Sequence, residues 1–442
     1  MTDDNNSGRI VNFRPLPALA IGVISGVAFT VWASGGFRLA QNADFKGTLL
    51  IAAVCFAAVT AIFAAALRKR FAAILLAAFL LGSLRVTLCV PDTAAGTSGV
   101  IEGTIVSIDE SSGGEGYAQI TLDNASLEGQ KQRYDIRLKV GAEQANAVMI
   151  GDRIGLDCVN IREPSSLYDG YDERLILLAE GVSLKADGVG DLAVLSRGNA
   201  PVRLALYKIR QRMQSAIDEV FGEHAGLVSG FLLGTKQNVP REEYDAMKTG
   251  GVAHLLTLSG FHVGVLTWLL FRLLPKRYPL LRALAAAAFL LVYCGVSGFN
   301  ASLVRASFMC VVMLLATVFE RKPDPLSSLS FSAVVILAVN PFMLYSLGFK
   351  LSFAATLGII LLCSTAVGTG RDGGRIWRRL TDTALATVGA TAATFLITAR
   401  YFGCVYSYSL IANLLTAPLF TVAVIMCFVL MILGLAAPAA AR

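Results

Sequence analysis

The sequence GGVAHLLTLSGFHVGVL, residues 250–266, has the apolar composition of a membrane helix but contains His254, Ser259 and His262. Ser259-Gly260 interrupts the run near its middle, and glycine lowers helix propensity by about 1 kcal/mol relative to alanine. A helix interrupted inside a membrane is tolerated only where its free backbone groups are buried in protein or line a wet cavity. The stretch therefore predicts a discontinuous membrane helix with polar groups at its break.

Apolar runs near the length of a bilayer crossing, about 20 residues, recur through the rest of the chain. Of the 442 residues, 55% are hydrophobic and 16% are charged, whereas soluble domains contain about 25% charged residues. The first three runs are Leu16–Trp32, Leu49–Leu67 and Phe71–Val90. By the same length criterion about seven more follow residue 225, so the sequence predicts a polytopic α-helical membrane protein with about ten transmembrane helices.

A polar region, residues 97–195, is inserted between these helices. Its segments IEGTIVSID, YAQITLDNASL, RYDIRLKV and GDRIGLDCVNI alternate like strands, with Gly, Asp and Asn turns between them. About five short strands in this length predict a small β-barrel similar to an OB-fold. The region contains 17 acidic and 8 basic residues, a net charge of −9.

Residues 200–222 follow the predicted barrel as an amphipathic segment. Its apolar residues recur at helical spacing, which predicts a helix along the outer membrane surface. An ordinary helix packed on the barrel is the alternative. The basic residues predicted on its wet side are Arg203, Lys208, Arg210 and Arg212. The chain thus divides into residues 1–92 with three helices, the barrel at 97–195, the amphipathic helix at 200–222 and a helical domain at 225–442.

The basic clusters predict the orientation in the membrane. Cytoplasmic loops are enriched in Lys and Arg, and in the second half each cluster lies two predicted crossings from the next. The clusters are Arg68–Arg70, Arg272–Arg282, Arg321-Lys322 and Arg371–Arg379. We therefore expect these segments and the N-terminus in the cytoplasm, and residues 97–195 outside it.

Four cations do not follow this bias and lie near the predicted outer ends of helices: Arg85, Arg305, Lys350 and Arg400. A cation in the middle of a membrane helix costs about 2.5–3.5 kcal/mol on insertion scales and indicates a functional role by default. Near an interface, the same side chains reach the headgroups at little cost. The functional interpretation is a set of positive charges that line an outer mouth, where an anionic polymer could enter.

The polar residues of the opening stretch allow several interpretations. They could satisfy one another and backbone carbonyls at a helix–helix contact, or they could line a pore or pathway. Ser259 with a histidine base would suggest an intramembrane serine hydrolase, although T-L-S-G is not the G-x-S-x-G pattern. A metal site is a further alternative, but the chain has three histidines, none of its cysteines forms a C-x-x-C pair, and no cofactor is expected. Cys89 and Cys158 are candidates for a disulfide on an oxidising side of the membrane.

Longer motifs give the chain a family resemblance. GGVAHLLTLSGFHVGVL resembles the signature of the ComEC family, the inner-membrane channels for DNA uptake in natural competence. FNASLVRASFM, with Asn300 and Arg305, resembles the family's Arg-Ala helix. NPFMLYSLGFKLSFAATLGI, with Lys350, and YSLIANLLTAPLF, with Asn413, resemble two later segments of the family, in the same order.

The resemblance implies a channel that moves one DNA strand from the periplasm into the cytoplasm. The residues expected along its path are His254, Ser259, Gly260, His262, Asn300, Arg305, Lys350 and Asn413, with Arg85 and Arg400 at the outer mouth. The expected partners are single-stranded DNA, the lipid bilayer, a periplasmic DNA receptor, and a cytoplasmic ATPase or DNA-processing protein. No P-loop motif is present to supply a motor. A small-anion transporter is an alternative function.

Family members commonly end in a metallo-β-lactamase-like domain. This chain shows no H-x-H-x-D-H pattern before Arg442, so we expect either a fragment or a short member, without nuclease activity.

The acidic barrel lacks Phe and Trp, whereas single-strand binding uses a basic groove and stacking aromatics.

Gly22 and Gly26 form a G-x-x-x-G motif, which predicts helix packing within the chain, with a homo-oligomer as the alternative.

Overall fold

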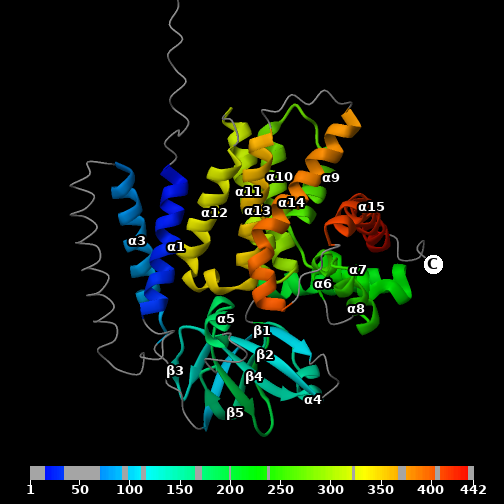
Figure 1. Cartoon of the computed structure of the whole chain (residues 1–442). Helices are drawn as coiled ribbons and strands as arrows, with labels where there is room; N and C mark the ends of the chain where they lie inside the picture. Colours follow the sequence, from blue (N-terminus) through cyan, green and yellow to red (C-terminus); the bar gives the residue numbers. More distant parts are fainter. Residues whose placement is uncertain are drawn as a thin grey trace, which may run out of the picture. The chain divides into compact units, whose positions relative to one another are not determined.

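The computed structural model describes residues 15–33, 70–91, 98–110, 116–164, 172–198, 201–235, 239–320, 324–366, 375–403 and 409–436 (Figure 1). The chain forms two compact units. The first comprises residues 1–90 with 324–344, and the second comprises residues 91–323 with 345–442.

The first unit contains helices α1 (Pro15–Ala33), α3 (Arg70–Cys89) and α12 (Pro325–Val339). Glycines let α1 and α3 approach closely: a Cβ at Gly26 would lie 2.1 Å from the Phe79 carbonyl oxygen, and one at Gly82 would lie 2.4 Å from that of Val23. Small residues at such crossings let backbones meet. The G-x-x-x-G motif therefore packs within the chain, as predicted.

The Arg85 side chain links α3 to α12 in this unit. Its Nε donates to the Ala338 carbonyl and its Nη2 to that of Val339, at 3.1 Å for the second bond. These carbonyls end α12, where the helix dipole favours a cation. Arg85, predicted at an outer mouth, thus caps a helix C-terminus.

Described residues near the start of the second unit form a seven-stranded sheet that closes as a barrel: β1 (Ser98–Glu110), β2 (Tyr117–Leu127), β3 (Gln130–Lys131), β4 (Asp135–Gly141), β5 (Arg153–Arg162), β6 (Val182–Gly188) and β7 (Ala193–Ser196). The five longer strands run in the order β1-β2-β4-β6-β5, and β5 pairs back with β1. The β4–β6 pair is parallel and the other pairs are antiparallel. The predicted small barrel is thus confirmed, and its topology is consistent with an OB-like domain.

The alternation of apolar and polar residues along the strands determines which side chains fill the barrel interior. Because successive side chains of a strand point to opposite faces, every second residue enters the core. Fully buried side chains from the five longer strands fill it: Ile101, Ile105, Ile120, Leu122, Ile136, Leu138, Ile154, Leu156 and Leu184. Cys158 belongs to the same core as a free thiol whose Sγ donates to the Leu156 carbonyl at 3.5 Å. The candidate Cys89–Cys158 disulfide was therefore wrong.

The Asp135 carboxyl at the start of β4 gives the barrel a pH-dependent stability. Burial, and secondarily the charge of Asp123, raise its pKa to about 6, while Arg203 lowers it. Because the folded pKa exceeds the unfolded value near 3.9, the group favours folding below about pH 4, and this contribution is lost as the pH rises through 6.

Asp135→Asn is therefore expected to stabilise the barrel at pH 8 by about 1 kcal/mol, after allowance for solvent screening, and to change little at pH 4. Hydrogen exchange of β4 amides in the intact chain, compared with the wild type at each pH, measures this. Asp191→Asn, at an exposed position, serves as the control. Equal effects of Asp135→Asn at both pH values would contradict the assignment.

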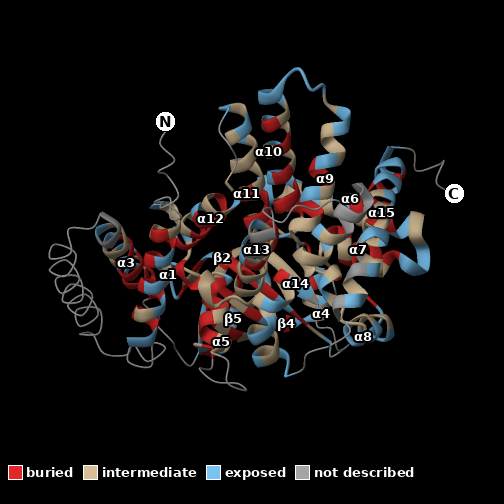
Figure 2. Ribbon diagram, turned by 45° about the horizontal axis from the view of Figure 1, so that its top comes forward, coloured by how far each residue is buried: buried red, intermediate tan, exposed pale blue. Residues whose placement is uncertain are grey.

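Helices make up most of the remaining residues of the second unit that the structure describes. Two short ones accompany the barrel: α4 (Ala142–Asn146) and α5 (Glu173–Ala179). The others are α6 (Pro201–Phe221), α7 (Ala225–Leu233), α8 (Arg241–Thr249), α9 (Gly260–Leu273), α10 (Pro279–Val296), α11 (Ala301–Val318), α13 (Leu347–Ala366), α14 (Arg375–Phe402) and α15 (Ser409–Ala436). Their shared core includes Ile217, Leu232, Leu258, Leu266, Leu290, Leu303 and Val424. Figure 2 shows buried segments of these helices in red.

Five of the described helices are long and apolar enough to cross a membrane: α1, α10, α13, α14 and α15. Four shorter apolar helices lie at Ala73–Cys89, Gly260–Leu273, Ser302–Val318 and Pro325–Val339. The predicted crossing at Leu49–Leu67 lies outside the described residues. The helices thus indicate a membrane protein, while the count of ten crossings stays a prediction.

Helix α6 contacts both the helices and the barrel. It packs against α7, α10 and α15, and Leu206 fills the space that a Cβ at Gly295 would need, at 2.7 Å. Arg203, predicted on the wet side, forms an ion pair of 2.7 Å with Asp123 of β2. Arg210 donates to the Thr235 hydroxyl at 3.1 Å. Two of its four basic side chains are therefore engaged within the protein.

Candidate functional site

The opening stretch of sequence is interrupted as predicted. Residues Ala253–Leu256 form a short 3₁₀ turn, and α9 begins at Gly260. Between them, Thr257 and Ser259 have extended backbones, with ψ values of 127° and 177°. The chain thus enters α9 as an extended segment, and the N-terminus of that helix lies inside the helical domain.

Ser259 and His262 contact each other at the start of α9. Ser259 is the N-cap of α9, and His262 is the third helical residue. The Ser259 amide donates to His262 Nδ1 at 3.2 Å, and Ser259 Oγ lies 3.4 Å from the same nitrogen. This is the geometry of a capping box, in which the side chain at the third position accepts from the N-cap amide.

The two predicted histidines lie in different environments. His262 is fully buried, with its ring 5.9 Å from that of Phe261 and 5.7 Å from that of Phe420, both edge-on. His254 is exposed on the 3₁₀ turn. Among the described residues no carboxylate contacts His262 and no cluster of three metal ligands exists.

Arg305 lies on α11, and its side chain is buried against α9 and α13. Its side chain is 5% exposed. Nη1 donates to Thr356 Oγ1 at 2.8 Å and contacts Met309 Sδ at 3.6 Å, and the guanidinium lies 5.5 Å from the ring centroid of Phe353. A Cβ at Gly260 would lie 3.7 Å from Nη2, so the guanidinium faces the start of α9.

The Arg305 charge has no counterion among the residues that the structure describes. Its Nε is buried and has no hydrogen-bond partner in that part of the chain. Burying an ionised group without a partner is costly, so such groups are normally paired or neutralised. The arrangement leaves a cation with an unused donor available to an anion.

Polar side chains continue from Arg305 along the contact between α11 and α13. Ser302 Oγ and Ser352 Oγ are 2.9 Å apart, and Thr356 donates back to the Ser352 carbonyl at 2.9 Å. Asn300, a predicted path residue, is the N-cap of α11, and its side chain accepts from the Ser302 amide at 3.0 Å.

The remaining predicted residues lie on α13, α14 and α15. Lys350 Nζ donates to the Tyr401 hydroxyl at 2.5 Å. Arg400 is in the last turn of α14 and is exposed. Asn413 lies on α15, where its Oδ1 is buried without a hydrogen-bond partner among the described residues. A role of these residues in a path stays a prediction.

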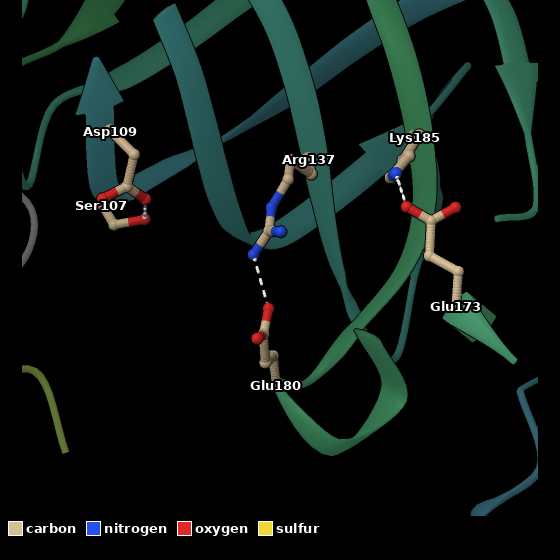
Figure 3. Close-up of polar contacts among 6 residues, drawn as sticks. All are labelled: Ser107, Asp109, Arg137, Glu173, Glu180 and Lys185. Carbon is tan, nitrogen blue, oxygen red and sulfur yellow. Dashed lines mark hydrogen bonds and ion pairs between the residues drawn. The ribbon is translucent and has the colours of Figure 1, made fainter. Parts of the chain in front are cut away.

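The barrel's cations differ from Arg305 because several are already paired with carboxylates. Arg137 bonds Glu180 at 3.0 Å and Arg174 bonds Glu163 at 2.8 Å. Lys185 pairs with Glu173, and both this pair and Arg137–Glu180 are visible in Figure 3. Because these cations are neutralised and the region has a net charge of −9, the barrel provides a weak site for a polyanion.

The sequence of the helical domain matches a known family. Residues 231–442 fit the family model described as competence protein. This match covers just under half of the chain, and over these residues the chain is similar to the competence protein family. The matched region includes the break, Arg305, Lys350 and Asn413.

Three relatives match parts of the chain. The chain is 33% identical over 145 residues to ComE operon protein 3 of Bacillus subtilis (strain 168), covering 32% of this chain and 19% of the relative. It is 33% identical over 156 residues to an uncharacterized protein of Aquifex aeolicus (strain VF5), covering 34% and 36%. Uncharacterized protein MG316 of Mycoplasma genitalium is 34% identical over 111 residues, covering 25% and 29%. The matches thus span little more than a third of any of these relatives, and no solved structure matches.

The structure adds residues to the competence domain that sequence reasoning missed. Thr356, Phe353 and Ser352 contact Arg305 or its neighbours, and Tyr345 and Tyr401 surround Lys350. Hydroxyl and aromatic residues are common in membrane helices, so these positions gave no signal of their own. Only Phe353 had such a clue, since it lies three residues after Lys350 on α13, and residues three apart share a helix face.

Proposed function

We propose that this competence protein conducts single-stranded DNA across the cytoplasmic membrane into the cytoplasm during natural transformation. The observation that carries the proposal is the buried Arg305 guanidinium, which has no carboxylate partner among the described residues. A cation within a membrane helix costs about 2.5–3.5 kcal/mol and marks a functional position by default. A phosphate oxygen would satisfy the unused Nε donor through a charge-assisted hydrogen bond.

The start of α9 supports the same role. A helix N-terminus has unsatisfied amides and the positive end of the helix dipole. Here that end lies beside Arg305, since Gly260 is the residue against Nη2. The break therefore adds to the positive field around Arg305, which favours a negatively charged substrate.

The proposal includes an orientation and partners. The barrel lies outside the cytoplasm, and the basic loops lie inside. A DNA receptor outside delivers the strand, and a cytoplasmic ATPase or DNA-processing protein supplies the direction of transport. The chain itself acts as a conduit and catalyses no reaction.

The test of the proposal is DNA entry in cells. A strain lacking the gene is expected to lose uptake of fluorescently labelled DNA into the cytoplasm, and expression of the full gene is expected to restore it. Unchanged uptake in the deletion strain would contradict the proposal. Loss of sulfate or phosphate uptake with normal DNA entry would favour the small-anion transporter instead.

Ser259→Ala separates a channel from a serine hydrolase. Loss of an N-cap costs about 1 kcal/mol, so DNA uptake is expected to stay within about twofold of the wild type. Ser259→Asn is the matched control, because asparagine caps a helix as well as serine but is not a nucleophile. Loss of uptake in both variants, at normal abundance in the membrane, would favour the hydrolase.

A further inference from the structure

Tyr345, Lys350 and Tyr401 form a cluster of one cation and two aromatic rings where α13 begins and α14 ends. Lys350 Nζ lies 5.0 Å from the ring centroid of Tyr401 and 5.5 Å from that of Tyr345. It also donates a hydrogen bond to the Tyr401 hydroxyl. All three residues are partly exposed, so part of the cluster's surface is accessible.

The Lys350 charge is available to an anion. An ammonium group has three N–H donors, and the Tyr401 hydroxyl uses one of them. No carboxylate pairs with Lys350 within the described ranges. In the barrel, by contrast, Lys185 is neutralised by Glu173. Lysine is thus paired with a carboxylate in the barrel, whereas Lys350 has no carboxylate partner among the described residues.

The two rings are held as neutral, oriented surfaces. Burial, with a contribution from the Asp172 carboxylate, raises the pKa of Tyr345 to about 12, so this phenol is uncharged at physiological pH. The hydrogen bond from Lys350 fixes the Tyr401 hydroxyl. A tyrosine that only anchors a helix to a lipid interface would direct its hydroxyl to water and headgroups.

Helix α13 connects this cluster to Arg305. The rings of Phe349 and Phe353 stack with centroids 4.1 Å apart, and Phe353 lies beneath the Arg305 guanidinium. Lys350 and Phe353 are one helical turn apart. Lys350 of α13 and Arg305 of α11 thus each lie beside an aromatic ring, and cations beside aromatic rings are the composition of sites that bind single-stranded nucleic acids.

We propose that Tyr345, Lys350 and Tyr401 form a nucleotide-binding subsite for single-stranded DNA, in which Lys350 contacts a phosphate and a tyrosine ring stacks on a base. This deepens the proposed function and rests on it. The subsite receives the strand at this end of α13 before its phosphates reach Arg305. It accepts any base, because every base has a face that can stack.

The test uses the purified full chain in nanodiscs of phosphatidylethanolamine and phosphatidylglycerol. Fluorescence anisotropy measures the affinity for a fluorescein-labelled oligothymidylate and for an abasic oligomer of the same length. The variant Tyr345→Leu/Tyr401→Leu is expected to bind the oligothymidylate about tenfold more weakly and the abasic oligomer unchanged. Lys350→Gln is expected to weaken binding of both oligomers and to reduce the salt dependence by about one phosphate contact.

Two controls separate stacking from misfolding. Tyr401→Phe keeps the ring and is expected to bind both oligomers as the wild type does. Tyr278→Leu removes a tyrosine that lies 5.7 Å from the Arg277 guanidinium at the start of α10, and no change is expected. The same chemical change is thus made at a cation–tyrosine pair outside the subsite.

The outcomes distinguish the subsite from the channel. If the wild type binds neither oligomer, the proposed function is wrong and the subsite with it. If the wild type binds both and the double tyrosine variant is unchanged, the subsite alone is wrong. Equal weakening toward both oligomers would show that the tyrosines serve a phosphate only, as a lipid headgroup would supply, and would also overturn the subsite.

Discussion

Arg305→Glu is expected to reduce uptake of labelled DNA by about 100-fold. The substitution removes the cation that we propose contacts phosphate and replaces it with a charge of the same sign as phosphate, and like-charge contacts cost several kcal/mol. Arg277→Glu is the matched control, because it makes the same charge change at a residue beside the exposed Tyr278. That variant is expected to stay within about twofold of the wild type, since exposed charges contribute little.

Arg305→Met separates transport from folding. Methionine has a similar length and no charge, so the variant no longer buries an ion without a counterion. Replacing a buried charge with a packed apolar side chain is often neutral or stabilising. We therefore expect unchanged or higher thermal stability in detergent, together with uptake reduced by about tenfold. Normal uptake in Arg305→Met, at wild-type abundance, would show that the guanidinium does not contact the strand.

Gly358→Leu is expected to destabilise the helical domain by about 3 kcal/mol or more, because overpacking at a close helix contact forces the backbones apart. A Cβ at Gly358 would lie 2.1 Å from the Gly389 carbonyl oxygen and 2.6 Å from the Ala393 Cβ. Both contacts join α13 to α14, which lie side by side in the fold (Figure 1). Abundance in the membrane and unfolding in increasing SDS measure the effect.

Gly264→Leu is the matched control for this substitution. Gly264 is also within a membrane-type helix, α9, but a Cβ there would meet nothing within 4 Å. Because leucine has a higher helix propensity than glycine, by about 1 kcal/mol, this variant is expected to be as stable as the wild type or slightly more stable. Similar behaviour of the two leucine variants would contradict the close α13–α14 contact.

The barrel was predictable from its local pattern, but its closure was not. Alternation in segments such as RYDIRLKV specifies which side chains face inward, because a strand has a period of two. The pairing of β1 with β5 joins Ser98 to Val159 and Gly103 to Ile154. Such pairing depends on residues far apart in sequence, and no periodicity within either strand encodes it.

The charged residues of the candidate site were predictable from the sequence, but the residues that contact them were not. Arg305 and Lys350 stood out because a charged residue in an apolar run is rare. Their partners Thr356 and Tyr401 are each 51 residues away in sequence and belong to neighbouring helices, so only the fold brings them together. The Ser259–His262 pair was within reach, because a spacing of three at a helix start is the capping-box spacing.

The hydrogen bonds of Arg85 bear on how the first helices are made. The acceptor carbonyls of α12 lie 253 and 254 residues farther along the chain. At a synthesis rate of about 5–20 residues per second, the ribosome needs about 10–50 s to produce them. During that interval the nascent α3 holds a guanidinium whose acceptors do not yet exist. Assembly of these helices, α1, α3 and α12, is therefore completed only after translation has passed Val339.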